Sequence, residues 1–436
     1  MTSVQEPRLR IAICGGGISG LALAVALSQV PDVNVQLYES AGRFREIGAG
    51  VMIWFRTWRI LELLGVAEDF AKVANAPPTE ERGIGFDYRR SDMAGEGFRF
   101  GLFELPYGCI RFHRAHFLGA FIANLPSNIA HFGKRLASYD DSASGPVSLH
   151  FGDGTSAECD LLVGCDGIKS SIRTAMLHAI ARETGNAEVK SLGVPYWSGI
   201  IAYRGLIPTD KLVKDGKEHP AIATPIMYCG KSKHVVGYGI SRGTVVNVIT
   251  MNSHLDKEGT PYSEEWVTEC STEELLDCYA GWEDEVTDLL RHIEQPTKWG
   301  LHSIKPLPTY VHGSVALVGD SAHAMLPHQG AGSGQAIEDA YVLSRILSDP
   351  IVTKSSLSHA LAAYDAVRRP KANAILVGSR KSGQMYEFDD EALGERYEDL
   401  GPAIVHMWDW LWEEDPEADA REALDKMHAA IRDGLS

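Results

Sequence analysis

The chain has 436 residues, of which 44% are hydrophobic and 23% are charged, and its formal net charge at pH 7 is −17. A chain of this length can bury a large core, and we expect two or three domains or one large interrupted domain. The negative charge argues against nucleic acid and anionic membranes as partners.

Cysteine usage and hydropathy narrow the class of protein further. The seven cysteines are scattered and form no CxxC pair, which indicates reduced thiols, no zinc site and a cytoplasmic location. The uncharged run at residues 11–27 resembles a signal peptide or a short spanning helix, but three consecutive glycines interrupt it. Such glycines favour a tight turn between a strand and a helix. The sequence therefore predicts no membrane association.

The N-terminal region is typical of a βαβ unit. RIAIC predicts a strand, GGGISG a turn, LALAVALSQV a helix and NVQLYES a second strand. Gly15, Gly17 and Gly20 have the GxGxxG spacing, which lets a helix N-terminus approach the pyrophosphate of a dinucleotide. Glu39 ends the second strand, where a carboxylate can accept hydrogen bonds from ribose hydroxyls. This unit predicts a dinucleotide site, but it does not distinguish FAD from NAD.

The middle of the chain alternates between hairpins, helices and a β-rich stretch. HRAHFLGAFIAN predicts a helix, and VSLHFGDGTSAECDLLVGCDG predicts a hairpin with a DG turn. The hairpin region ends in GCDGIKSSIR, which places Asp166 at the end of a buried strand. Residues 189–251 are rich in strand formers and predict a separate sheet, and residues 263–293 are acidic and helical in pattern.

A second strand-turn-helix signal lies in residues 315–340. Asp320 follows the strand SVALVG and can accept hydrogen bonds from the ribityl hydroxyls of a flavin. The glycine-rich segment PHQGAGSGQ then opens a helix whose N–H groups would face an anionic isoalloxazine ring. The residues beyond about 372 predict a charged helical tail. Together with the first unit, this segment favours FAD over NAD as the bound dinucleotide.

The order of these motifs resembles the class A flavoprotein aromatic hydroxylases, which have a fold like 4-hydroxybenzoate hydroxylase. The resemblance covers almost the whole chain. It implies an α/β fold with a Rossmann-like FAD-binding domain of the glutathione-reductase type, an inserted mixed or antiparallel β-sheet domain for the substrate, and a helical C-terminal tail. The expected boundaries are 1–75, 105–185 and 300–375 for the FAD domain, 76–104 and 186–299 for the sheet domain, and 376–436 for the tail.

The resemblance also implies an activity. A member of this class holds FAD non-covalently, takes NADH or NADPH as co-substrate, and uses O₂ to hydroxylate a phenolic acid through a flavin C4a-hydroperoxide. The first expectation is the oxidative decarboxylation of salicylate to catechol. Two alternatives stay open: hydroxylation or dearomatisation of another phenol, such as a hydroxybenzoate or a polyketide phenol, and a flavin-fold binding protein without turnover. The oligomeric state is open, with a homodimer as the first candidate.

The site residues that the resemblance implies fall into two sets. The cofactor set is Gly15, Gly17, Gly20, Glu39, Arg45, Gly50, Met52, Arg114, Asp166, Asp320, Gly332 and Ser333. On the substrate side, Arg204 in AYRGLI and Tyr238 in HVVGYGI resemble the arginine and tyrosine of the dearomatising relatives. A buried arginine needs an anion, so Arg204 is either a substrate anchor or part of a local ion pair.

Two histidines are candidates for accepting the phenol proton. They are His234 and His328, the latter in LPHQG, and the reason is that imidazole titrates near neutral pH. A purely structural role for each is the alternative. The chain departs from the resemblance at Trp54-Phe55-Arg56-Thr57, where relatives have a Gly/Trp-Pro-Asn-Ala stretch beside the flavin, so the shape of one pocket wall is not predicted.

Overall fold

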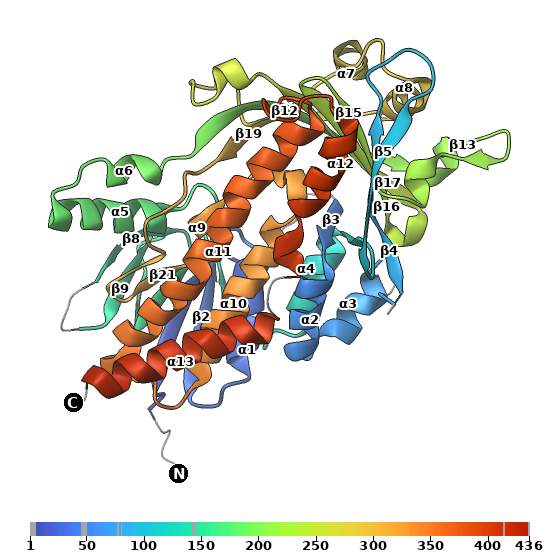
Figure 1. The fold of residues 1–436 in the computed structure, drawn as a ribbon. Helices are drawn as coiled ribbons and strands as arrows, with labels where there is room; N and C mark the ends of the chain where they lie inside the picture. The colour runs from blue at the N-terminus through green and yellow to red at the C-terminus, as the bar shows by residue number, and fades with distance from the viewer. Residues whose placement is uncertain are drawn as a thin grey trace.

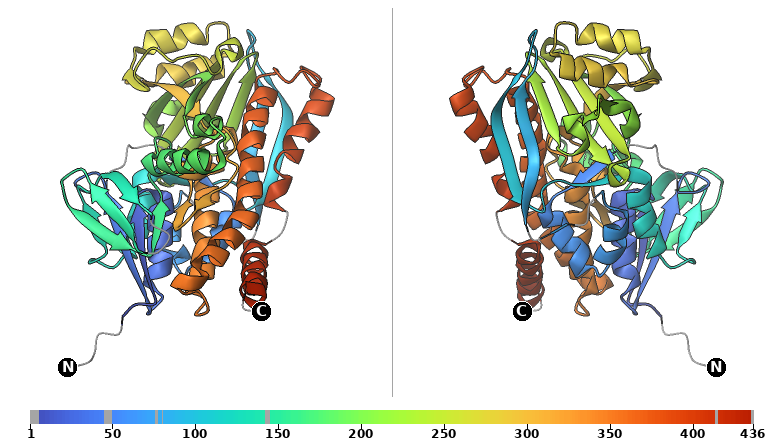
Figure 2. Two further views of the ribbon diagram at one scale, coloured as in Figure 1. Left: turned by 90° about the vertical axis from the view of Figure 1, so that its left-hand side faces the viewer. Right: turned by 90° about the vertical axis from the view of Figure 1, so that its right-hand side faces the viewer.

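The computed structural model describes residues 6–44, 50–75, 78–79, 81–141, 145–412 and 415–434 of the chain. Two sheet-based parts are stacked one above the other, as Figure 1 and Figure 2 show. The lower part in Figure 1 contains a mostly parallel sheet with helices, and the upper part contains a large twisted sheet. The mixed α/β architecture with a helical C-terminal segment that the sequence predicted is therefore present.

The lower part is built on a sheet that joins segments far apart in the sequence. In the described part of the chain, six strands lie in the order β20-β21-β11-β1-β2-β7, and all neighbours are parallel except β20 and β21. The strands are β1 (Leu9–Cys14), β2 (Val33–Glu39), β7 (Ala130–Phe132), β11 (Leu161–Gly164), β20 (Val311–His312) and β21 (Val315–Leu317). The central strands are continuous apolar runs because both faces of a parallel sheet are covered.

Helices cover one face of this sheet and a small antiparallel sheet covers the other. Helix α1 packs against α10, and almost all of α1 is buried. Side chains of the small sheet, such as Leu149 and Phe151, enter the same core as β1. The elements are α1 (Ile18–Ser28), α2 (Phe55–Leu63), α3 (Ala67–Val73), α4 (Arg114–Ala123), α5 (Ser171–Thr184), α6 (Val189–Leu192), α9 (Asp320–His323), α10 (Gly332–Ser348), α13 (Pro416–Gly434), β8 (Leu136–Asp140), β9 (Val147–Phe151) and β10 (Ser156–Cys159).

The upper part is a sheet in the order β18-β19-β12-β17-β16-β15-β4-β5, antiparallel except between β15 and β4. Its strands are β4 (Arg82–Arg90), β5 (Phe98–Pro106), β12 (Tyr196–Pro208), β15 (Ile226–Gly230), β16 (Lys233–Ile240), β17 (Val245–Ser253), β18 (Val267–Glu269) and β19 (Thr297–Ser303). One face packs against helices α7 (Thr272–Cys278) and α8 (Asp284–Arg291). The opposite face contacts the lower part, and we call it the inner face.

Two elements join the parts. Strands β3 (Gly50–Ile53) and β6 (Ile110–His113) form an antiparallel ribbon that packs against the inner face. The long helix α11 (Leu357–Tyr386) runs along both parts, and α12 (Tyr397–His406) follows it beside β5. Of the predicted domain boundaries, the one at 375–376 falls inside α11 and the one at 299–300 falls inside β19.

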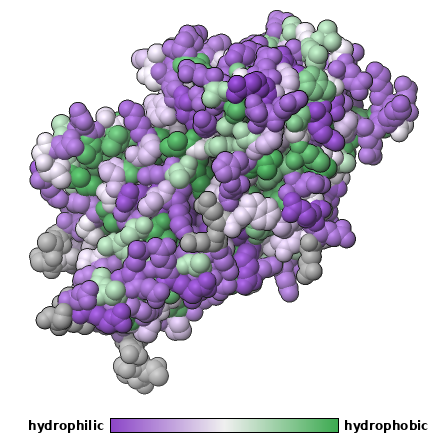
Figure 3. Space-filling view, viewed as in Figure 1, coloured by the Kyte–Doolittle hydropathy of each residue, from purple (hydrophilic) through white to green (hydrophobic). Residues whose placement is uncertain are grey.

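Short elements complete the described part of the chain. The short elements are β13 (Val213–Lys214), β14 (Lys217–Glu218) and the 3₁₀ turns η1 (Thr209–Leu212), η2 (Pro220–Ile222), η3 (Ser241–Gly243), η4 (Leu255–Lys257), η5 (Pro327–Gln329), η6 (Lys354–Ser356) and η7 (Asp409–Leu411). On the face seen in Figure 3, hydrophilic residues cover most of the surface, and hydrophobic residues gather in patches across its middle. Among the helices that the structure describes, none has the length and apolarity to cross a membrane.

Candidate active site

Each of the three glycines of the predicted dinucleotide motif is required for a different physical reason. A β-carbon at Gly15, whose φ is +114°, would lie 2.1 Å from the carbonyl oxygen of Cys165, so this turn tolerates only glycine. A β-carbon at Gly20 would lie 1.9 Å from the carbonyl oxygen of Gly15, so α1 packs directly on the turn. Gly17 caps α1, and a β-carbon there would meet no protein atom within 4 Å. The backbone is thus open at the helix N-terminus, where an anionic phosphate binds well.

Glu39 lies beside this turn. It ends β2, and its carboxylate accepts hydrogen bonds from the backbone N–H of Gly16 at 2.7 Å and of Ala41 at 2.6 Å. Because β1, β2, β11 and β21 are parallel neighbours, the turns that follow them lie at the same edge of the sheet. The three motifs at Gly15, Asp166 and Asp320 are therefore brought together, although the first and the last lie near opposite ends of the sequence.

The aspartate of the DG motif caps a helix. The carboxylate of Asp166 accepts hydrogen bonds from the N–H groups of Ser171 at 2.8 Å and Ile172 at 3.2 Å, and from the hydroxyl of Ser170 at 2.5 Å. These bonds satisfy amides that the first turn of α5 leaves unpaired. The carboxylate thereby fixes the shape of the loop at 167–170, and a contact of Asp166 with the cofactor stays a prediction.

The GD motif lies next to this loop. Asp320 starts α9 and is exposed at the sheet edge, and the preceding Gly319 has a φ of +70°. Arg173 of α5 donates to the carbonyl oxygen of Ser321 at 3.0 Å and so ties the two loops together. Burial lowers the pKa of Arg173 to about 10, while the negative charges of Asp166 and Asp320 oppose this shift. Arg173 was not among the predicted site residues, although it lies in the same decapeptide as Asp166.

The ribbon β3–β6 meets the loop before α10 at the junction of the two parts. The hydroxyl of Ser333 donates to the carbonyl oxygen of Met52 at 3.3 Å. Gly330 has a φ of +56°, and a β-carbon there would lie 2.7 Å from Sδ of Met52. Gly332 begins α10, so the N-terminus of this helix opens beside Met52. The predicted cofactor residue Arg45 lies outside the described residues.

Gly50 connects the ribbon to the inner face of the upper sheet. Its N–H donates to Oδ1 of Asn247 at 2.9 Å, and a β-carbon at Gly50 would lie 2.6 Å from the hydroxyl oxygen of Tyr238. The strand register places Tyr238 directly opposite Asn247. Arg114 begins α4. The pKa of Arg204 is lowered mainly by burial of Arg204 and, to a smaller extent, by the positive charge of Arg114.

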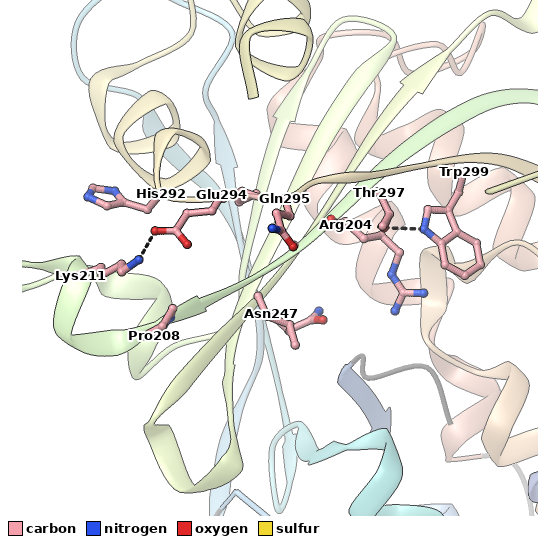
Figure 4. Close-up of a pocket in the computed structure, with 12 residues that line it drawn as sticks. Arg204, Pro208, Lys211, Asn247, His292, Glu294, Gln295, Thr297 and Trp299 are labelled. Atoms are coloured by element: carbon pink, nitrogen blue, oxygen red, sulfur yellow. Dashed lines mark hydrogen bonds and ion pairs between the residues drawn. The ribbon is translucent and has the colours of Figure 1, made fainter. Parts of the chain in front are cut away.

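A cavity of about 410 Å³ opens along the sheet beside Arg204, Asn247 and Trp299, as Figure 4 shows. The guanidinium group of Arg204 lies over the ring of Trp299 at 5.1 Å. Within the described part of the chain, the side chain of Arg204 forms no hydrogen bond or ion pair, which favours a substrate anchor over a local ion pair, and both roles stay predictions. Burial lowers its pKa, which means that an anion bound here would be strongly favoured.

Tyr238 is buried in the same face. Burial raises its pKa, and the nearby charges of Arg204 and Arg111 oppose the rise. The hydroxyl is therefore protonated at pH 7 and is a hydrogen-bond donor as well as an acceptor. Nδ2 of Asn247 is buried without a hydrogen-bond partner in the described structure, so it is a further free donor. Asn247 and Trp299 were not predicted as site residues, because neither belongs to a motif of its own.

The two histidines lie apart from this cluster and close to each other. His234 is four residues before Tyr238 on β16, which corresponds to about 13 Å along an extended strand. Nδ1 of His234 lies 2.8 Å from the carboxylate of Glu387, and the rings of His234 and His328 are 5.3 Å apart. Burial is the main cause that lowers the pKa of His328 well below its ordinary value, and the charges of His234 and Arg380 add to it. The sequence prediction grouped these histidines with Arg204 and Tyr238. The structure instead places Arg204 near Tyr238 and His234 near His328.

Residues 54–57, where the sequence differs from the related hydroxylases, have structural roles. Nε1 of Trp54 donates to the carbonyl oxygen of Gln329 at 3.1 Å, and its ring packs on Trp408. The guanidinium of Arg56 is buried and bonds to Glu338 at 3.0 Å and to Asp419 at 2.7 Å. This segment thus connects α2 with α10 and α13 behind the loop that contains Gln329.

These observations fit a flavin dinucleotide. The glycine turn leaves backbone amides open at the N-terminus of α1, and Glu39 lies beside it. The turn before α10 presents a second open helix N-terminus next to Met52. Among the described residues, there is no cluster of histidine, cysteine or carboxylate side chains that could hold a metal ion.

Comparison with known proteins gives one consistent result. Residues 8–379 match the family described as FAD binding domain. The chain is 39% identical to a salicylate hydroxylase of Pseudomonas putida over 422 residues, which cover 95% of this chain and 94% of that protein. It is 36% identical to a 6-methylsalicylate 1-monooxygenase of Aspergillus terreus, over 96% of this chain and 92% of that protein.

A solved structure agrees with these relatives. The structure of a salicylate hydroxylase substrate complex superimposes with a TM-score of 0.84 at 35% identity, and the match covers 96% of this chain and 98% of that chain. The similarity therefore extends over both sheet-based parts and the C-terminal helices, and not over the dinucleotide motifs alone.

Proposed function

The chain belongs to the FAD binding domain family and is a class A flavoprotein aromatic hydroxylase, and from this premise we propose that it converts salicylate to catechol. It is an FAD-dependent monooxygenase whose co-substrate is NAD(P)H. The observation that supports the proposed substrate is Arg204 on the inner face beside Tyr238 and Asn247, where its side chain has no ion pair with any residue that the structure describes. A cavity with free cationic and neutral donors suits a small aromatic acid, because a carboxylate and a phenolate are both acceptors.

We propose that the open edge of the lower sheet holds FAD. Gly15, Gly17 and Gly20 would leave room for the pyrophosphate, Glu39 would bind the adenosine ribose, and Asp320 would bind the ribityl chain. The segment around Met52, Gly332 and Ser333 would lie beside the isoalloxazine ring. When bound, FAD accepts hydride from NAD(P)H and activates O₂ for transfer to the substrate.

The residues of the inner face position the aromatic acid. The guanidinium of Arg204 would pair with the carboxylate or the phenolate, since charge-assisted hydrogen bonds are stronger than those between neutral groups. The hydroxyl of Tyr238 and the amide of Asn247 would fix the orientation of the ring. An ionised phenol is electron-rich at the ortho carbon, which in salicylate carries the carboxylate. Oxygen transfer there gives a non-aromatic ketone, and loss of CO₂ restores aromaticity.

The reaction balances without a further reactant. One salicylate anion, one O₂, one NAD(P)H and two protons give catechol, CO₂, water and NAD(P)⁺. The C–C bond to the carboxylate breaks after the new C–O bond has formed, and the second oxygen atom leaves as water. His234 lies beside Glu387 and His328, away from Arg204, so we assign a structural role to these two histidines.

The test is turnover of salicylate by the FAD-loaded protein. We expect salicylate to stimulate NAD(P)H oxidation and to yield catechol and CO₂ in equal amounts. Arg204→Met should lower kcat/KM by about tenfold to a hundredfold and raise the share of NAD(P)H consumed without product, because the ring is held less firmly. Arg242→Met, at an exposed position, is the control. Hydroxylation at an unsubstituted carbon with retention of the carboxylate would contradict the proposed reaction.

One relative favours a second candidate substrate. The similarity to a 6-methylsalicylate 1-monooxygenase makes ring-substituted salicylates candidates for the same reaction. A panel of salicylates that differ in one substituent would rank them by kcat/KM. A protein that binds FAD but turns over no member of the panel would support the third possibility, a binding protein without catalysis.

We also propose a cytoplasmic homodimer. All seven cysteines are free, as expected for a reducing compartment. Light scattering on the purified protein measures its mass directly, and a mass near twice the 47.6 kDa of one chain would support the dimer.

A further inference from the structure

Arg111 is a half-buried cation whose Nε and Nη1 atoms are fully buried, and no sequence motif singled it out. It lies in β6, opposite Met52 in the ribbon. Ile110 and Phe112 of this strand enter the core of the lower part, so Arg111 and His113 point to the other side, toward the inner face. A β-carbon at Gly239 of β16 would lie 3.9 Å from Nη1 of Arg111. The guanidinium therefore reaches the strand that carries Tyr238.

The described residues do not balance this charge. Nε and Nη1 of Arg111 are buried and have no hydrogen-bond partner, and no described carboxylate forms an ion pair with Arg111. The titratable groups that act on it are Cys109 and Tyr238, and burial raises the pKa of both, so both are neutral at pH 7. A buried cation without an anion is unfavourable, so this position indicates an anion that is not part of the described chain.

The neighbours of Arg111 are also donors. Arg204 acts on Tyr238 electrostatically from β12, and Arg111 acts on it from β6, so the tyrosine lies within range of both guanidinium groups. Asn247 uses its carbonyl oxygen on Gly50 and keeps its amide free. Two cations and two neutral donors, three from the inner face and Arg111 from the ribbon that faces it, match a ligand with more than one acceptor group.

We propose that Arg111 is a second substrate-positioning residue, and that the aromatic acid bound here carries two separate acceptor groups, one for Arg204 and one for Arg111. This inference rests on the proposed function and specifies its substrate class. A salicylate with a further hydroxyl, keto or carboxylate group on the ring binds more tightly than one with an alkyl group at the same position. The reason is that an alkyl group would leave the guanidinium of Arg111 buried and unpaired.

The test is ligand binding to the FAD-loaded protein without NAD(P)H, measured by the change in flavin absorbance. The probes are salicylate and pairs of ring-hydroxylated and ring-methylated salicylates with the same substitution position. For at least one position, the wild-type protein should bind the hydroxylated member at least about fivefold more tightly, as expected for a hydrogen bond to a charged group. Absence of this preference at every position overturns the proposal, and this arm needs no variant.

Variants assign the preference to Arg111. Arg111→Gln should weaken binding of the hydroxylated acid by about tenfold and of the methylated acid by less than about twofold, and Arg111→Lys should restore part of the difference. Arg396→Gln, at a side chain that is 64% exposed, is the matched control and should change neither affinity. Equal weakening of both acids by Arg111→Gln indicates a structural role and overturns the proposal.

The two hypotheses fail in different ways. A preference for the hydroxylated acid without any turnover supports the role of Arg111 and contradicts the proposed reaction. Turnover of salicylate without any preference between paired acids supports the reaction and contradicts the role of Arg111.

Discussion

At the scale of single residues, Gly17 is a position where substitution by alanine should weaken FAD binding without disturbing the fold. A methyl group there meets no protein atom within 4 Å and the backbone φ of −80° suits alanine, so the fold should tolerate Gly17→Ala. The methyl group would lie where a pyrophosphate approaches the N-terminus of α1. We expect Gly17→Ala to lower FAD occupancy of the purified protein while the unfolding midpoint of the FAD-free protein shifts little, measured by flavin absorbance and circular dichroism.

A second glycine gives the matched control for this experiment. Gly42 is exposed, and a β-carbon added to it would also meet no atom within 4 Å, so Gly42→Ala should leave both FAD occupancy and stability unchanged. Full flavin retention in Gly17→Ala would contradict the assignment of this turn to the pyrophosphate.

His328 makes the stability of the protein depend on pH. Its pKa in the folded state lies below that of an unfolded histidine, about 6.5, so the unfolded chain takes up the proton first as the pH falls. The contribution of His328 is therefore complete above about pH 6.5, and the free energy of unfolding falls by up to about 1.4 kcal/mol for each pH unit below it. His328→Asn should reduce the loss between pH 7.5 and pH 5.5, measured by urea unfolding at both values.

His178, an exposed histidine on α5, is the control position for this pH effect. His178→Asn should leave the difference between the two pH values as in the wild-type protein. An unchanged difference in His328→Asn would show that other groups cause the pH dependence.

At the scale of elements, a buried ion-pair network connects four helices. Arg56 of α2 bonds to Glu338 of α10 and Asp419 of α13, and Arg368 of α11 bonds to Glu338 at 3.1 Å. Arg56→Met would leave two buried carboxylates with fewer partners, and we expect a loss of about 3–5 kcal/mol in the free energy of unfolding. Arg59→Met, one turn later and 48% exposed, should cost less than about 1 kcal/mol. Similar losses in both variants, measured by urea unfolding, would contradict a structural role for the network.

At the scale of the whole molecule, the proposed FAD site lies where the two sheet-based parts meet. The glycine turn belongs to the lower sheet, while Gly50 and Met52 lie on the ribbon that contacts the inner face of the upper sheet. A cofactor bound there stabilises the folded state by about 2.7 kcal/mol at a free concentration one hundred times its Kd. Adding FAD to the FAD-free protein should therefore raise the midpoint of thermal unfolding in a concentration-dependent way, measured by calorimetry. A midpoint that does not respond to FAD would contradict a site at this junction.

The sequence by itself determined the local geometry of the cofactor turns. Gly15 and Gly20 could be recognised because their spacing reports a turn and a helix start, which depend on backbone conformation over a few residues. The apolar runs likewise predicted the strands that these turns follow, and the βαβ pattern predicted that the first two of them are parallel. The position of Arg204 and Tyr238 on strands of one sheet also followed from the sequence, through the resemblance to aromatic hydroxylases.

Only the tertiary structure decided which of these residues meet. It separated His234 and His328 from Arg204, since strand register fixes where a side chain lies along a sheet. It paired Arg56 with Glu338 and Asp419, which lie 282 and 363 positions further along the chain. It also brought Arg111 of the ribbon to the strand of Tyr238. Such contacts depend on how separate elements pack, and the sequence of one element does not indicate which distant residues it will contact. For this reason the turns that suit FAD could be read from the chain, whereas the second cation of the substrate face could not.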